Sequence, residues 1–206
     1  LVATGGKSYP LTGSTGDGYK WAEKFGHTII TPKPSLCALE CSEKWISELE
    51  GLSLKNVQFT LCDSSDKKLF TDFGEMLFTA KGVSGPIVLS SSRFAAVRDF
   101  KNLIAYIDFK PALSLEKLDE RLLRDFEKYN KKQISNAFGD LLPMRLIPVV
   151  IRQCGLNPED KVYTITKVQR RKIAEVLKNF KLHINGSAPF AEAIITMGGI
   201  KTSEIN

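Results

Sequence analysis

A glycine-rich run near the start of the sequence has the residue types of a ligand-binding loop. Residues 3–18 read ATGGKSYPLTGSTGDG, with five glycines among Thr and Ser hydroxyls, and they lead into an expected helix over 17–25. Glycine lets the backbone approach a ligand closely, and the N–H groups at a helix start favour anions. The run therefore predicts a cofactor- or anion-binding loop, with a flexible surface loop as the alternative.

The Gly-Lys-Ser triplet at 6–8 resembles the end of a phosphate-binding P-loop, but the rest of that motif does not fit. The motif requires a glycine five residues before Gly6, and Leu1 stands at that position. The triplet is also followed by Tyr9-Pro10 and not by a helix. We therefore reject the P-loop interpretation.

Other residue types with catalytic potential are scattered. His27 follows the first expected helix and His183 lies in an alternating strand, so structural roles are favoured for both. Carboxylates such as Asp72 and Glu75 offer no convincing acid–base pair, which leaves the catalytic residue unassigned. The cysteines have no spacing typical of zinc sites, so reduced, mostly buried thiols and no metal are expected: Cys37, Cys41, Cys62 and Cys154.

The composition is that of a soluble globular domain, and its positive charge is concentrated in one stretch. Hydrophobic residues make up 43% and charged residues 25%. No apolar run approaches the length of about 20 residues that spans a bilayer, so we expect a cytoplasmic protein. Residues 114–181 hold 15 basic and 9 acidic residues, which matches the whole net charge of +6. A nucleic-acid patch is one interpretation, but interleaved acidic residues favour a solvated helix face.

Residues 35–113 predict a small antiparallel β-barrel or sandwich. Val57, Phe59 and Leu61 alternate on one face of an expected strand, and a polar turn follows. A returning strand is expected over 69–73. Further strands are expected over 75–80, 86–91 and 103–109, which together suffice for a small barrel.

The next stretch, 114–181, predicts a subdomain of about three helices. Ser114 is suited to cap the first helix, and Pro143 is suited to the first turn of the second. Thr166 and Gln169 have the spacing of a capping box at the start of the third. After these helices, residues 181–184 predict a strand that returns to the barrel.

Both ends of the sequence have the character of strand ends. Residues 1–3 are apolar and run into paired glycines, and the apolar run 193–197 is followed by Gly198-Gly199. We therefore expect the chain to be an internal segment of a larger protein, cut at both ends.

Three blocks of the sequence resemble motifs of the BaiN/YhiN/aminoacetone-oxidase-type flavoproteins, a family of NAD(P)/FAD-dependent oxidoreductases. The first block is 3–22, followed by Gly26-His27 and by PKPSL at 32–36. The second is GEMLFTAKGVSGP at 74–86, and the third is EAIITMGGIKTSEI at 192–205. The blocks occur in the family's order and cover the whole chain.

The resemblance implies an α+β fold, in which a small antiparallel β-barrel and a helical subdomain are inserted into a Rossmann-like FAD domain that is mostly absent here. The implied parts are a flavin-proximal hinge (1–34), the barrel (35–113), the helical subdomain (114–181), and a return strand with a second hinge (182–206). In the implied architecture the helical subdomain closes over the flavin.

The implied activity is hydride transfer through FAD to a small or steroid-like molecule, with NADH or NADPH as reductant. The G-x-G-x-x-G fingerprint for the FAD pyrophosphate is absent from the sequence. We therefore expect this segment by itself to bind no FAD tightly and to be inactive. Its expected partner is the rest of its own FAD-binding domain.

By the same resemblance, two sets of residues would lie at the site. The cofactor-side set is Thr4, Gly5, Gly6, Ser8, Thr12, Gly13, Ser14, Thr15, Gly16, Asp17, Gly198 and Gly199. The substrate-side set is Gly82, Ser84, Gly85 and Pro86. The sequence departs from the family pattern at Ala80, where a His is common, so no acid–base residue carries over.

Two rival functions remain besides the oxidoreductase segment. A barrel with basic helices could bind RNA or DNA, but the aromatic residues alternate as core, so a nucleic-acid partner is disfavoured. A protein-interaction or dimerisation unit is the other rival.

Overall fold

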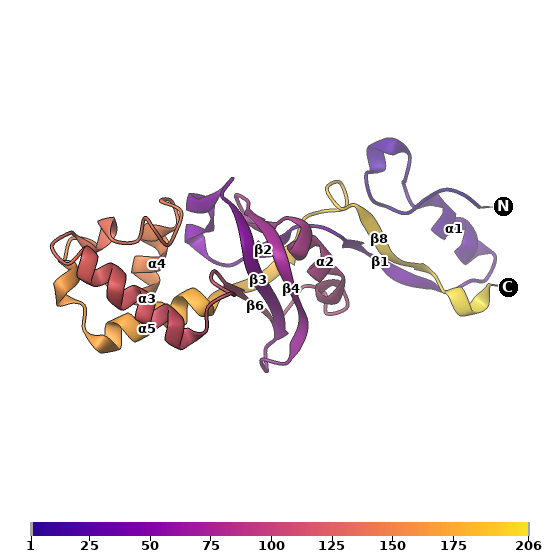
Figure 1. The fold of residues 1–206 in the computed structure, drawn as a ribbon. Helices are drawn as coiled ribbons and strands as arrows, with labels where there is room; N and C mark the ends of the chain where they lie inside the picture. The colour runs from indigo at the N-terminus through magenta and orange to yellow at the C-terminus, as the bar shows by residue number, and fades with distance from the viewer. Residues whose placement is uncertain (1, 206) are drawn as a thin grey trace.

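Six short strands close into an antiparallel barrel at the centre of the molecule (Figure 1). The computed structural model describes residues 2–205. The barrel order is β2-β5-β4-β3-β6-β7. The strands are β2 (Leu39–Cys41), β3 (Ser53–Asp63), β4 (Lys68–Phe78), β5 (Gly82–Ser84), β6 (Leu103–Asp108) and β7 (Phe180–Ser187). The α+β barrel class predicted from the sequence is confirmed.

The inward positions of the long strands are the apolar ones of the sequence pattern. Phe59 and Leu61 on β3 and Ile107 on β6 are fully buried, and Phe59 pairs with Ile107 across the two strands. The register between β3 and β4 shifts between Leu54 and Val57. At this irregularity Asn56 has a left-handed backbone (φ 56°), so the strand bends there.

The segment predicted as a strand over 86–91 is instead the start of helix α2 (Pro86–Ala96), so that prediction was wrong. The apolar, β-branched Ile87-Val88 pair suggested a strand. The buried positions continue at 91, 92, 95 and 96, which is the spacing of a helix face. Pro86 lies in the first turn of the helix, where a missing N–H costs nothing.

The helical subdomain contains three α-helices, α3 (Leu115–Lys128), α4 (Ile147–Cys154) and α5 (Lys167–Lys178). The Ser114 hydroxyl accepts a hydrogen bond from Lys117 N–H at 3.3 Å, and Thr166 forms the full capping box with Gln169. The second helix begins later than predicted, at Ile147, because residues after Pro143 form a turn first.

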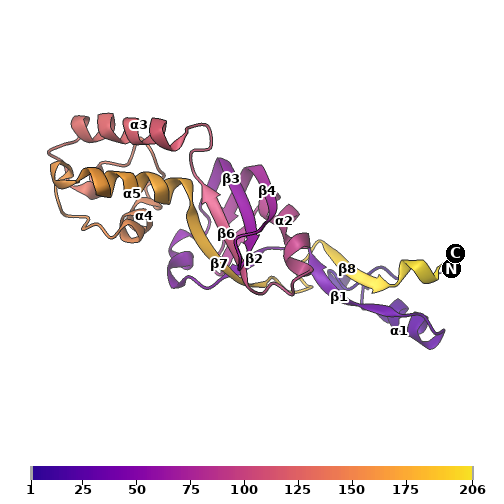
Figure 2. The same ribbon diagram turned by 90° about the horizontal axis from the view of Figure 1, so that it is seen from below.

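A two-stranded antiparallel sheet lies at the opposite end of the molecule from the helical subdomain (Figures 1 and 2). It pairs β1 (Ile29–Ser35) with β8 (Ile195–Ile200), and α1 (Asp17–Lys24) lies beside it. Residues 31–34, which include two prolines, are part of β1. Val2 and Ala3 lie outside any strand, and residue 1 falls outside the described residues.

The barrel separates the two ends, which gives the molecule an elongated shape (Figure 2). Its apolar core is continuous with that of the helical subdomain. On the other side, Lys33 of β1 forms an ion pair with Asp99 at 2.6 Å and donates to the Ala96 carbonyl at 3.0 Å. The helical subdomain and the 3–18 loop thus lie on opposite sides of the barrel (Figure 1), and closure over a flavin stays a prediction.

Candidate functional site

The Thr196 side chain organises the glycine-rich loop from the far end of the chain. Its Oγ1 accepts hydrogen bonds from the N–H groups of Lys7 at 2.7 Å and Ser8 at 3.1 Å, and it lies 3.0 Å from Ser8 Oγ. Tyr9 N–H donates to the Phe190 carbonyl at 3.1 Å. The loop is therefore held against β8 and the segment that precedes it.

Two glycines allow this close approach. A methyl group added at Gly6 would lie 2.5 Å from Thr196 Oγ1, and one added at Gly18 would collide with the Thr4 hydroxyl. The loop also folds on itself, since a methyl group at Gly5 would lie 2.9 Å from Ser14 Oγ. Glycine is thus explained by packing against Thr196 of β8 at Gly6, and by packing within the loop at Gly5 and Gly18.

Gly198 and Gly199 of β8 belong to the same site. Both have backbones in the region that favours glycine, with φ of 89° and 108°. A methyl group would lie 2.7 Å from the Thr31 carbonyl at Gly198 and 2.9 Å from the Tyr19 ring at Gly199. The structure therefore brings together the two parts of the predicted cofactor-side set, which lie at opposite ends of the sequence.

Helix α1 begins inside this loop, with Gly16 at its N-cap and Asp17 in its first turn. Asp17 accepts hydrogen bonds from Thr15 Oγ1 at 2.7 Å and Lys20 Nζ at 2.9 Å. These bonds and the Lys20 charge hold the pKa of the Asp17 carboxyl below its usual value. The Asp17 carboxylate is therefore ionised at neutral pH, paired with Lys20, and occupies the helix start where a phosphate would otherwise lie.

Most large apolar side chains that the protein exposes surround the same end of the molecule. Leu11 is fully exposed and Phe25 is 82% exposed. The others are Val2, Tyr9, Trp21, Ile30, Ile194, Ile195 and Ile205. An apolar surface of this kind is typical of a face that another part of a protein covers.

The substrate-side set lies in the barrel and not in the sheet unit. A methyl group at Gly82 would collide with the Leu39 carbonyl of β2, and one at Gly85 (φ 95°) would lie 2.8 Å from Met76 Cα. Ser84 ends β5 and Pro86 opens α2. Ala80 lies exposed in the turn between β4 and β5. Close backbone packing therefore accounts for the two glycines.

Both histidines lie beside carboxylates. His183 Nδ1 lies 2.8 Å from Glu43 Oε1, and the same oxygen accepts the His183 N–H at 2.9 Å. His27 Nδ1 lies 3.9 Å from Glu204 Oε2, a carboxylate that also accepts from Thr28 N–H and Oγ1. The His183 ring thus has a hydrogen-bond partner, whereas the His27 ring lies beyond hydrogen-bond distance of Glu204, and its structural role stays a prediction.

Within residues 2–205, no cluster of three or more His, Cys, Asp or Glu side chains could hold a metal ion. All four cysteines are free thiols, with Cys37 and Cys62 buried. Across the same residues, no helix combines the length and apolar character needed to cross a bilayer. A cytoplasmic location stays a prediction.

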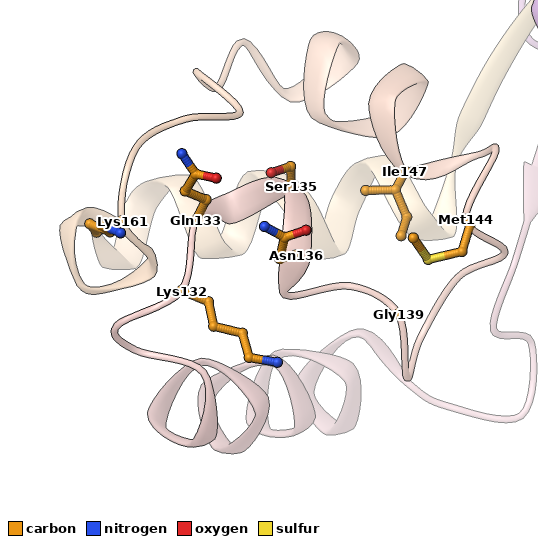
Figure 3. Close-up of a pocket in the computed structure, with 8 residues that line it drawn as sticks. All are labelled: Lys132, Gln133, Ser135, Asn136, Gly139, Met144, Ile147 and Lys161. Atoms are coloured by element: carbon orange, nitrogen blue, oxygen red, sulfur yellow. The ribbon is translucent and has the colours of Figure 1, made fainter.

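A separate pocket of about 530 Å³ lies in the helical subdomain (Figure 3). It is lined by Lys132, Gln133, Ser135, Asn136, Gly139, Met144, Ile147 and Lys161. Lys132 and Lys161 form no ion pair with any described residue, and Lys132 instead lies 4.3 Å from the Tyr129 ring. The sequence pattern placed the positive charge within 114–181 but gave no indication of this pocket.

Thr196 is the main site residue that the sequence analysis missed. It lies within the third motif block, two residues before Gly198, and that position was the available signal. Its role follows only from the fold, since its partners are more than 180 residues away in sequence.

A family model described as HI0933-like protein barrel and H2TH domain matches residues 33–195. The chain belongs to this HI0933-like family, which confirms the family-level resemblance seen in the sequence. It is 30% identical over its full length to a ribosomal RNA dihydrouridine synthase of Haemophilus influenzae, and 25% identical to the Escherichia coli protein of that name. It is also 25% identical to a 3-dehydro-bile acid delta(4,6)-reductase of Clostridium scindens.

The chain spans about half the length of these curated relatives, at 48%, 49% and 50% of each in the same order.

Proposed function

We propose that this member of the HI0933-like family is the substrate-side insert of a flavin-dependent oxidoreductase, and that the rest of the protein supplies the FAD-binding domain. The observation that carries the proposal is the glycine-rich loop, fastened by Thr196 beside Gly198 and Gly199. The names of all three relatives denote the making of a reduced product, which supports a reductive activity.

The loop residues fit the ring and hydroxyl-bearing part of FAD better than its pyrophosphate. Asp17 would repel a phosphate at the helix start, but its carboxylate can accept hydrogen bonds from hydroxyl groups. The small side chains of the loop leave backbone groups accessible to a flat ring. When bound, FAD would supply the hydride chemistry, and the residues of this chain would position it and exclude water.

We assign the cofactor side to the loop and the return hinge together. Thr196 would fix the backbone of Lys7 and Ser8, so that the remaining loop groups from Thr4 to Asp17 face the cofactor. The substrate-side role of Gly82, Ser84, Gly85 and Pro86 stays a proposal, because close packing within the barrel also accounts for the two glycines. In this proposal residues up to 34 and from 182 onward are the hinges of the insert.

The exposed apolar side chains at this end would be covered by the FAD-binding half of the same protein. Both described ends of the chain lie here (Figure 1), so the rest of the protein would attach at this face. Leaving side chains such as Leu11 and Phe25 in water costs free energy that a covering domain removes.

The names of the relatives suggest two substrate classes, and we propose a uridine in RNA as the first candidate. Its reduction would add a hydride to one carbon of the uracil C5=C6 bond and a proton to the other, while the flavin is oxidised. The positive charge of the helical subdomain, which the sequence pattern alone favoured as a solvated helix face, is compatible with this substrate. With the names of the first two relatives beside it, we prefer RNA here to the earlier expectation that disfavoured a nucleic-acid partner. The small, steroid-like molecule expected from the sequence is the second candidate, supported by the third relative.

An anaerobic half-reaction with the full-length protein tests the proposal. The flavin would be reduced with NADPH or NADH, and then mixed with unmodified ribosomal RNA or with a 3-oxo steroid that carries conjugated double bonds. Reoxidation of the flavin by RNA, together with dihydrouridine in the product, is the expected result. Reoxidation by the steroid alone would favour the second candidate, and a full-length protein without flavin would contradict the proposal.

A further inference from the structure

A groove of about 550 Å³ lies where the barrel meets the helical subdomain. Four segments form it: the irregular start of β3, the middle of β4, the link from β6 to α3, and α3 itself. Their side chains at the groove include Lys55, Phe73, Phe109, Lys110, Leu113 and Arg121. The helical subdomain, whose helix α3 contributes Arg121 to the groove, lies across the barrel from the glycine-rich loop (Figure 1).

Phe73 gives the groove an exposed aromatic face. This side chain is 56% exposed on β4, whereas the other aromatic residues of the long strands β3 and β4 are buried or half-buried. Beside it, Phe109 is buried and packs against Phe180 with ring centroids 5.0 Å apart. Phe73 thus lines the same groove as a buried aromatic pair, and its exposed ring is available for stacking.

The groove carries three cations and no carboxylate among its lining residues. Lys55 and Lys110 form no ion pair with any residue of the described chain. The nearby Asp108 is already occupied, because it pairs with Lys178 and accepts the Lys110 N–H at 2.8 Å. Burial, and after it the neighbouring Arg121 charge, lowers the pKa of Lys110.

The positive surface continues beyond the groove along α3. An adjoining groove shares Leu113 and Arg121 and adds Lys117 and Arg124. Positions 117, 121 and 124 lie on one face of the helix. Its acidic members are Glu120 and Asp125, and Asp125 lies 3.6 Å from Arg121 Nε. A basic surface that runs from the groove along α3 fits a charged polymer better than a small anion.

We propose that this groove binds a single-stranded stretch of RNA, with one base stacked on Phe73 and backbone phosphates against Lys55, Lys110 and Arg121. Aromatic platforms flanked by cations are the general means by which proteins hold unpaired nucleotides. The inference rests on the proposed RNA substrate. Since the groove lies far from the glycine-rich loop, it anchors nucleotides that flank the reacting one.

Fluorescence anisotropy with the 206-residue chain and a labelled 12-nucleotide oligouridine tests the groove. Phe73→Leu is expected to weaken binding about 5- to 100-fold. The matched control Tyr163→Leu removes another exposed aromatic ring, 71% exposed on the helical subdomain, and is expected to leave the affinity unchanged. Equal effects of the two variants would overturn the proposal.

Salt dependence gives a second readout that does not depend on Phe73. Replacing both Lys55 and Lys110 with Gln is expected to reduce the slope of log K against log salt by about 1.4, at about 0.7 for each lost phosphate contact. Lys24→Gln, at the opposite end of the molecule, serves as the control. An unchanged slope in the double variant would contradict the proposal.

Competition separates RNA from other anions. Uridine monophosphate or a glutamate 12-mer that displaced the RNA at equal concentration would show a small-anion or acidic-peptide site and overturn the inference. The assay uses no flavin. If the full-length protein is yellow but the 206-residue chain binds no RNA, the groove proposal alone is refuted. If the groove binds RNA but the full-length protein holds no flavin, the oxidoreductase proposal alone is refuted.

Discussion

Replacing Thr196 with Val removes the hydroxyl that fastens the glycine-rich loop and keeps the shape of the side chain. The variant loses the bonds from the N–H groups of Lys7 and Ser8 and the contact with the Ser8 hydroxyl. A hydrogen bond in a protein contributes about 0.5–1.5 kcal/mol net. Because these groups are only part-buried, water replaces some of the loss, and we expect about 1–2 kcal/mol of local stability to disappear.

Amide hydrogen exchange of the 206-residue chain measures this effect directly. A loss of about 1–2 kcal/mol corresponds to exchange about 5- to 30-fold faster at Lys7 and Ser8. The full-length variant is expected to retain less flavin in the same preparation. Thr71→Val is the control, since its hydroxyl contacts only Thr60 on the exposed barrel surface at 2.7 Å. Unchanged exchange at Lys7 and Ser8 in the Thr196 variant would refute the role given to this residue.

Three further predictions concern the barrel, the helical subdomain and the thiols. Gly82→Ala forces β2 and β5 apart and is expected to cost about 1–3 kcal/mol in denaturant unfolding, whereas Gly139→Ala, with Met144 Sδ 3.9 Å away, is expected to be close to neutral. Arg170 binds both carboxylate oxygens of Asp119, at 2.9 and 3.0 Å, and lowers the pKa of Asp119. The stability that this ion pair contributes is therefore fully present above the ordinary Asp pKa of about 3.9. It is lost as the pH falls through the lower pKa that Asp119 has in the folded protein. Asp119→Asn should remove about 1–2 kcal/mol at pH 7 and flatten the acid limb of the stability profile; an unchanged acid limb would contradict the assignment. Burial raises the pKa of all four thiols, that of Cys154 to about 12, so a thiol reagent at pH 8 should modify them fast only after denaturation.

The parts of the fold that depend on local pattern could be predicted from the sequence. The alternation of Val57, Phe59 and Leu61 marked a barrel strand, and the Thr166–Gln169 pair marked a helix start. The helix α2 was missed because Ile87-Val88 favours a strand locally, while burial of one helical face against the barrel decides the structure.

The site could be predicted only in part. The glycine positions predicted a loop whose backbone packs closely against neighbouring residues. Thr196 contacts this loop through a tertiary hydrogen bond that no local sequence pattern encodes. The groove with Phe73 was missed for a similar reason. Phe73 was expected among the alternating core aromatics, but its side chain lies on the outer face of the barrel. The cations of the groove come from three other segments, which only the fold brings together.

The division of the flavin site between this chain and the rest of the protein is tested by the flavin absorbance of the purified full-length protein, compared with that of the 206-residue chain with and without added FAD. We expect a yellow full-length protein with about one flavin per chain, and a folded but colourless segment. A full-length protein that never binds flavin would contradict the oxidoreductase proposal, and a segment that retains flavin alone would contradict the division of the site between the insert and the FAD-binding half.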